Sequence, residues 1–227
     1  MKMIFRPMVL TALAFGLALP AMAQEAPATT DPVAAAAPAT EAAPATDTAT
    51  EAAPTIKPEQ YLGNPEYMLN LDLSTGGRVV VQLYPDVAPH HVERVKQLGR
   101  AGFYDGVKFH RVIDGFMAQT GDVANGNMED NFNLRAAGTG GSDMPNLPAE
   151  FSKVPHARGS IGAARSANPD SANSQFFIKF KDNDFLNGQY TVYGQVISGM
   201  EHVDAITRGE PPANPDRMIS VKVAADA

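Results

Sequence analysis

The residues best suited to chemistry in this chain lie between 109 and 122, and Arg111 is the first of them. A guanidinium is always protonated and offers several N–H donors in a rigid fork, so it can stabilise a lone pair that develops in a transition state. Gln119, further along the same segment, could orient the arginine or hydrogen-bond a substrate backbone. By residue type alone, Arg111 is more simply interpreted as a salt-bridge arginine, and the alternative for Gln119 is a solvated strand residue.

Two adjacent apolar pairs, Phe116-Met117 and Phe176-Phe177, accompany these polar residues. Neighbouring residues on a strand point to opposite sides, so only one member of each pair can lie inside a β structure. The other member can line a groove on the outside. Periodicity alone favours ordinary core packing, so the pairs indicate a groove only together with the motif around them.

Composition excludes or disfavours several other kinds of chemistry. The chain has no Cys, which excludes thiol nucleophiles, disulfides and thiolate-bound metals. His90 and His91 are adjacent at a predicted helix start and make a poor metal pair, and the run at 138–142 lacks the lysine of a phosphate-binding loop. We therefore expect no metal and no cofactor. A net charge of −7 without a Lys/Arg run argues against a nucleic-acid partner.

The predicted elements that must position these residues are mostly strands. Alternating residues over 67–73 and 78–83, separated by a Gly-containing turn, predict an antiparallel hairpin with Leu69, Leu71 and Leu73 on its inner face. Six further short runs predict strands at 108–113, 116–120, 160–164, 175–180, 191–197 and 218–224. Because no βαβ alternation is present, we expect a mainly β fold, a closed eight-stranded antiparallel β-barrel capped by two α-helices.

The first predicted helix follows the hairpin. Asp86 could cap it, Pro89 suits its first turn, and Gly99 or Gly102 would end it. Its inner face would carry Val92, Val95 and Leu98, and its opposite face Glu93, Arg94 and Lys96. We expect this helix to close one end of the barrel.

The second predicted helix is short, at 201–207, with Val203 and Ile206 facing inward. Between 122 and 160 the sequence shows little periodicity and predicts loops packed over the barrel surface. A loop of that length in a compact domain is usually functional or mobile.

The N-terminal part of the chain differs in composition from the rest. Lys2 and Arg6 accompany an apolar run at 8–19 that is too short to span a bilayer, and a small-residue cleavage pattern follows at 21–23. Together they predict a signal peptide over 1–23, with an uncleaved membrane anchor as the alternative. Residues 24–60 are mostly Ala, Pro and Thr and should form a disordered tether. Residues 61–227 remain for one folded domain.

Three segments resemble, in the same order, the cyclophilin family of peptidyl-prolyl cis-trans isomerases. They are Phe103–Asp122, which contains Phe109-His110-Arg111, then Ser174–Ile178, and then Phe185–Gly188 followed by Val192–Val196. The resemblance covers essentially all of residues 65–225. It implies that Arg111 is the catalytic arginine and that Gln119 assists it. It also implies a proline pocket formed by Phe116, Phe177 and Leu186, with Met117 at the groove edge, and substrate main-chain contacts by Ala164 and Arg165.

The chain departs from many eukaryotic members of this family at two positions. Phe185 stands where they have Trp, and Tyr190 where they have His. Phe185 lacks the indole N–H, which puts tight cyclosporin binding in doubt, while Tyr190 keeps a ring that can form a pocket wall. Both are predicted substrate-binding residues and point to a bacterial-type member. The stretch at 123–137 is also longer than in compact members.

The function implied by this resemblance is isomerisation of X-Pro bonds in exported polypeptides, in support of their folding. The expected partners are proline-containing unfolded or flexible segments, and in a bacterium the expected location is the periplasm. We expect a monomer, without a membrane span once the signal peptide is removed. Two alternatives stay open: a binding module or holdase that uses the same groove without turnover, and a structural spacer with an inert head.

Overall fold

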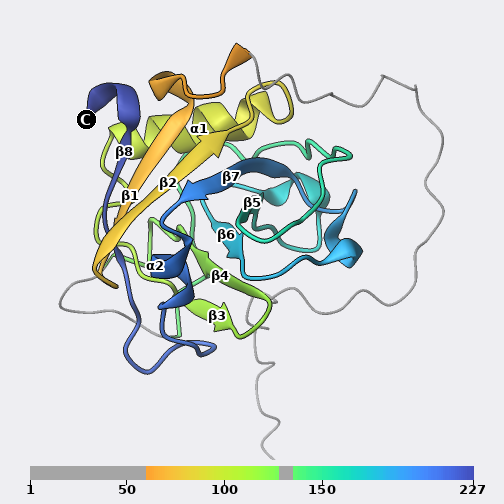
Figure 1. Cartoon of the computed structure of the whole chain (residues 1–227). Helices are drawn as coiled ribbons and strands as arrows, with labels where there is room; N and C mark the ends of the chain where they lie inside the picture. The colour runs from red at the N-terminus through yellow and green to blue at the C-terminus, as the bar shows by residue number, and fades with distance from the viewer. Residues whose placement is uncertain (1–59, 128–134) are drawn as a thin grey trace, which may run out of the picture. The chain divides into compact units, whose positions relative to one another are not determined.

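The computed structural model describes residues 60–127 and 135–227 (Figure 1). The predicted signal peptide, and the predicted tether except for Gln60, lie outside these residues. The strands are β1 (Met68–Leu73), β2 (Gly77–Leu83), β3 (Arg111–Ile113), β4 (Met117–Thr120), β5 (Ser160–Ala163), β6 (Phe176–Lys179), β7 (Val192–Ser198) and β8 (Met218–Val223). The α-helices are α1 (Pro89–Arg100) and α2 (Met200–Asp204), and short 3-10 helices cover Pro65–Tyr67, Pro169–Ser171, Asp184–Leu186 and Ala224–Asp226.

The eight strands form one antiparallel sheet in the order β3-β4-β6-β5-β7-β2-β1-β8, which confirms the predicted fold class. The helix α1 packs against β7 and β8, and α2 against β2 (Figure 1). Within residues 60–127 and 135–227, no helix is both long and apolar enough to cross a membrane.

The sheet curls into a half-barrel, so the prediction of a closed barrel was slightly overstated. The edge strands β3 and β8 share no ladder in the described part of the chain. The only strand-like links at this seam, among the described residues, are isolated bridges that join Val112 to Gly209 and Lys108 to Arg217. The segment before β8 contains Pro211, Pro212 and Pro215. Proline has no N–H to donate to a ladder, which explains why this segment forms no strand beside β3.

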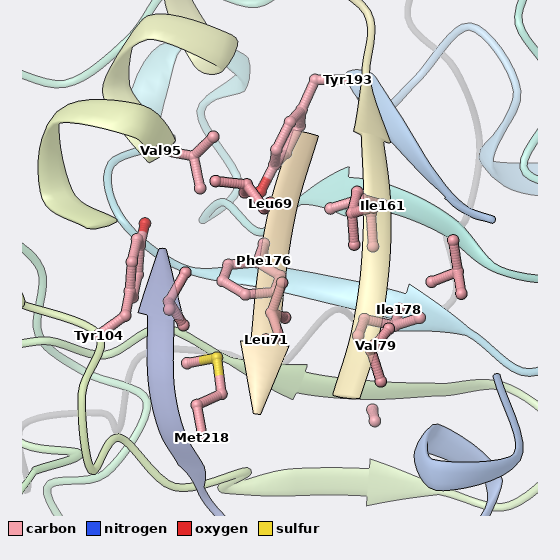
Figure 2. Close-up of a cluster of buried hydrophobic side chains, with 14 of the residues drawn as sticks. Leu69, Leu71, Val79, Val95, Tyr104, Ile161, Phe176, Ile178, Tyr193 and Met218 are labelled. Carbon is pink, nitrogen blue, oxygen red and sulfur yellow. The ribbon is translucent and has the colours of Figure 1, made fainter. Parts of the chain in front are cut away.

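The interior of the half-barrel is apolar, and the predicted hairpin supplies much of it. Leu69, Leu71 and Leu73 are buried, and β1 pairs with β2 from Met68 opposite Gln82 to Leu73 opposite Gly77. Figure 2 shows the core side chains gathered between the strands, with Leu69, Leu71, Val79, Val95, Ile161, Phe176, Ile178 and Met218 among those labelled.

The N-terminus of α1 is not capped by Asp86 as predicted. The N-cap residue is Ala88, which forms no side-chain cap. Instead the Glu150 carboxylate accepts hydrogen bonds from the backbone N–H groups of His90 and His91, each at 3.1 Å. A loop far along the chain therefore satisfies these donors, which a local reading of the sequence cannot reveal.

The two helices differ from prediction in other respects. Val92, Val95 and Leu98 face the core as expected, but Arg94 and Lys96 are also buried. Lys96 Nζ lies 2.6 Å from Glu66 Oε1, and Arg94 donates to the Pro145 carbonyl at 2.7 Å. Their polar ends thus reach partners while the alkyl stems are covered. The second helix ends at Asp204 instead of residue 207, although Val203 and Ile206 are buried as predicted.

Candidate active site

A groove of about 640 Å³ lies beside β3, β4 and β6. The predicted site residues that line it are Arg111, Phe116, Met117, Gln119, Ala164, Phe177, Leu186 and Tyr190. Of the predicted residues, Phe185 is not among the lining side chains. The long loop after β4 also contributes, with residues 135 and 137–142 on one wall. The structure thus brings together residues from four distant parts of the sequence.

The apolar side of the groove is a cluster separate from the barrel core. Met117, Phe177 and Leu186 are buried in it, and Ile113, Phe116, Ala164 and Tyr190 pack against them. The barrel core holds Phe176 instead. The neighbours Phe176 and Phe177 therefore face opposite sides of β6, as the alternation predicts.

Phe116 and Met117 do not alternate between core and groove as predicted, because both belong to the groove cluster. Phe116 precedes β4 and lies in a turn in which Gly115 adopts a left-handed φ of 65°. A residue in such a turn is not bound by strand geometry. Met117 is 2% exposed and lies at the base of the cluster, not at the groove edge as predicted.

The Phe177 ring depends on a glycine in the neighbouring strand. Gly162 of β5 is paired with Phe177 of β6, and a Cβ at Gly162 would lie 2.3 Å from the ring. His156 stacks on the same ring with centroids 5.8 Å apart. The ring is thus confined by backbone and by an aromatic neighbour. The burial of His156 lowers its pKa to about 4, so this ring is neutral near pH 7.

Tyr190 forms the wall that the sequence predicted for it. Its ring meets Phe177 edge to face, with centroids 6.1 Å apart. The Arg165 guanidinium lies 4.3 Å from the Tyr190 centroid and donates to the carbonyls of Ser166 and Gln189, each at 2.9 Å. Arg165 therefore ties two loops together and supports the Tyr190 ring.

Phe116 has two neighbours of different kinds. Phe185 is 59% exposed and stacks on Phe116 with centroids 5.7 Å apart, so it covers Phe116 instead of lining the groove. Lys179 Nζ lies 3.8 Å from the Phe116 centroid and donates to the Asn183 side chain. Burial lowers the pKa of Lys179 to about 7. Lys179 is not among the predicted site residues. It lies two residues after Phe177 in β6, so strand alternation places both on the same face.

The polar side of the groove is built around Arg111. In the β3–β4 pair, Arg111 lies directly opposite Gln119. The hydrogen bonds of both side chains lead to other partners: Arg111 Nε donates to Glu210 Oε2 at 2.8 Å, and Gln119 Nε2 donates to Gln175 Oε1 at 3.0 Å. In the structure Glu210 holds the arginine, and orientation of Arg111 by Gln119 stays a prediction. A hydrogen bond from Gln119 to substrate stays a prediction.

A loop rich in glycine forms the opposite wall. Gln175 Nε2 donates to the carbonyls of Gly138 and Gly140, and the Asp122 carboxylate accepts from the backbone N–H groups of the same two residues at 2.8 and 3.0 Å. Gln175 thus connects this wall to Gln119. The buried His110 ring packs below Gly138, and burial lowers its pKa to about 4.

These contacts define what the groove can do. Among the described residues, the terminal nitrogens of Arg111 have no hydrogen-bond partner and no three His, Asp or Glu side chains are arranged to hold a metal. The groove offers a fixed cationic donor next to an apolar pocket. Such a site can hold a small apolar ring and donate a hydrogen bond to an atom beside it.

Known proteins share this sequence and architecture. The family model for the cyclophilin type peptidyl-prolyl cis-trans isomerase/CLD matches residues 69–223. A probable peptidyl-prolyl cis-trans isomerase of Brucella suis is 55% identical over 168 residues, which span 72% of this chain and 85% of that relative. Peptidyl-prolyl cis-trans isomerase B of Bacillus subtilis is 36% identical over 140 residues, which span 61% and 89%.

Solved structures resemble the described fold as well. The cyclophilin AquaCyp293 from Hirschia baltica matches with a TM-score of 0.63 and 27% identity, over 72% of this chain and 76% of that one. A cyclophilin type isomerase from Cryptosporidium parvum matches with a TM-score of 0.59 over 69% and 98%; at 22% identity it supports the fold alone.

Proposed function

Because this chain belongs to the cyclophilin-type peptidyl-prolyl cis-trans isomerases, we propose that it accelerates X-Pro rotation by donating a hydrogen bond from Arg111 to the proline nitrogen. Amide resonance sets a barrier of about 18–20 kcal/mol to this rotation. In the twisted transition state the resonance is lost, and the nitrogen becomes pyramidal with a free lone pair. A donor fixed near that nitrogen stabilises the twisted state more than the planar one, which is the requirement for catalysis.

The observation that carries this proposal is the free end of Arg111 beside the apolar cluster. Glu210 occupies Nε, which leaves both terminal nitrogens available to a bound peptide. Met117, Phe177 and Leu186 form a buried base on which a proline ring can pack. No nucleophile, base or metal is needed for this reaction, because no covalent bond is made or broken.

The decisive test is Arg111→Ala, assayed by protease-coupled isomerisation or by NMR exchange on a short proline peptide. We expect kcat/KM to fall by about 100-fold, the usual cost of removing a transition-state donor, with peptide affinity changed only a few-fold. Arg158→Ala is a matched control, since Arg158 pairs with Asp204 and does not line the groove. Full activity in Arg111→Ala would overturn the proposed role. Peptide binding without turnover in the wild type would instead favour the holdase alternative.

We also propose that the proline-containing substrates are exported polypeptides and that the enzyme assists their folding in the periplasm. This proposal rests on the sequence of residues 1–23, with its basic start, short apolar run and small-residue cleavage pattern. Cell fractionation with intact mass measurement should find the protein outside the cytoplasm, beginning at Gln24. A cytoplasmic protein that retains Met1 would contradict it.

A further inference from the structure

We propose that Glu210 is the positioning residue for Arg111, and that the donor geometry of this enzyme depends on it. The inference rests on the proposed catalytic role of Arg111. The Arg111 side chain is 13% exposed and the Glu210 side chain 50% exposed, so the pair lies at the rim of the groove with the arginine on its inner side. Both residues line the groove.

The backbone brings these two side chains together. Val112 N–H donates to the Gly209 carbonyl at 2.7 Å, and Gly209 N–H donates back to the Val112 carbonyl at 2.8 Å. This reciprocal pair fixes the chain on either side, so the residues next to it, Arg111 and Glu210, are held within reach of each other. The contact between Arg111 and Glu210 therefore follows from the backbone hydrogen bonds between β3 and the segment before β8.

The atom that Glu210 engages matters for the chemistry. A guanidinium has five N–H groups in one plane, and an acceptor at Nε fixes the orientation of that plane without occupying the four terminal N–H groups. A carboxylate that gripped both terminal nitrogens would instead compete with the substrate. A donor held in advance loses little conformational freedom when the substrate binds, which favours the transition state.

The position of the pair also separates this role from a purely structural one. The Glu210 carboxylate is half exposed, so solvent screens its ion pair and we expect the pair to contribute little to stability. The same segment has a second ion pair nearby, between Arg208 Nε and Asp114 Oδ1 at 3.1 Å, which does not involve Arg111. Its removal takes one ion pair from the same segment without touching Arg111, so it provides a matched control.

The experiment compares Glu210→Ala, Glu210→Gln and Asp114→Ala by NMR exchange on a proline peptide. We expect Glu210→Ala to lower kcat by about three- to ten-fold with little change in KM, because the loss is one of donor orientation. Glu210→Gln keeps an oxygen acceptor at the same reach and should recover most of the activity. Asp114→Ala should behave as wild type. The Arg111 Nε–Hε resonance should exchange slowly with water in wild type and rapidly in Glu210→Ala.

A double-variant cycle completes the test. In an Arg111→Ala background, Glu210→Ala should cause no further loss of the remaining activity. Equal or higher activity of Glu210→Ala than wild type would overturn the inference, as would an equal loss in both backgrounds. If Arg111→Ala itself is fully active, the proposed arginine mechanism fails; if it is inactive while Glu210→Ala is unaffected, only the positioning role fails.

Discussion

Lys179 places an amine inside the molecule, with its side chain fully buried and its Nζ against the ring of Phe116. Burial disfavours the charged form, which is why the pKa falls from an ordinary 10.5 to about 7. Asn183 and the aromatic face offset part of this cost. A strand lysine is thus buried against a groove residue, at a cost in stability.

This arrangement predicts that Lys179→Met stabilises the fold below neutral pH. Between about pH 7 and 10.5 the unfolded chain binds a proton that the folded chain does not, so wild-type stability rises with pH across that window. At pH 6 we expect Lys179→Met to exceed wild type by about 1–3 kcal/mol in the free energy of unfolding, with the difference shrinking as the pH rises. Urea unfolding from pH 6 to 10 measures it. The exposed Lys181→Met is the control, and a pH-independent difference would refute the explanation.

The site residues that can be predicted from the sequence lie within local motifs, whereas Glu210 reaches the site from a distant segment of the chain. Arg111, Phe116 and Phe177 lie within motifs. Strand alternation required that one of Phe176 and Phe177 lie outside the barrel core, and the family resemblance selected Phe177. Glu210 could not be found in this way, because it reaches Arg111 from a segment about a hundred residues away that folds back along the seam. The local sequence pattern predicts the face of the strand on which a side chain lies, but not the distant residue that it contacts.

Among the elements, β6 serves two apolar clusters at once. Phe176 and Ile178 face the barrel core, while Phe177 faces the groove cluster and Lys179 lies against Phe116. In the adjacent strand β5, Gly162 has no side chain and so leaves room for the Phe177 ring. The pocket wall therefore depends on two strands and on the absence of one side chain.

We predict that Gly162→Ala impairs the pocket more than the fold. The added Cβ would lie 2.3 Å from the Phe177 ring, which must move. We expect about a ten-fold or greater loss in kcat/KM from the displaced wall, and a loss of about 1–3 kcal/mol in stability from overpacking. Gly99→Ala is the control, because its Cβ would meet Val221 at an ordinary 3.6 Å within a helix. Normal activity in Gly162→Ala would show that the ring can shift without consequence.

The predicted elements were correct in kind and less accurate at their ends. All eight strands were found because each alternates or carries β-branched and aromatic residues, but β3 is shorter than expected because Lys108 forms only an isolated bridge. The Asp86 cap and the closed barrel failed for a shared reason. Each depends on contacts between remote segments, the Glu150 carboxylate in one case and the proline-rich seam in the other.

Across the whole molecule, two buried histidines couple folding to acidity. His110 lies under one wall of the groove and His156 behind the other, and burial lowers the pKa of each to about 4 from 6.5. Between about pH 4 and pH 6.5 both histidines are protonated in the unfolded chain but neutral in the folded chain. The contribution of these two histidines to stability is therefore full above about pH 6.5 and is lost as the pH drops towards 4.

We predict a loss of up to about 1.4 kcal/mol per pH unit for each histidine across this window. Thermal or urea unfolding between pH 7.5 and 4.5 measures the slope, and the double variant His110→Gln, His156→Gln should flatten it. Above about pH 7 both rings are neutral in either state, so there the double variant should show the same pH dependence as wild type, which is the internal control. An unchanged slope in the double variant would assign acid sensitivity to other groups.

The sharing of β6 by two clusters has a practical consequence for refolding experiments. A slip of one residue in the pairing of β6 would turn Phe177 inward and Phe176 outward, because strand neighbours alternate. A misaligned chain could then look compact by spectroscopy and yet lack the apolar cluster of the groove. The ratio of recovered catalytic activity to the recovered fraction of compact molecules would therefore report how many molecules have correctly aligned strands. Activity thus measures the accuracy of folding.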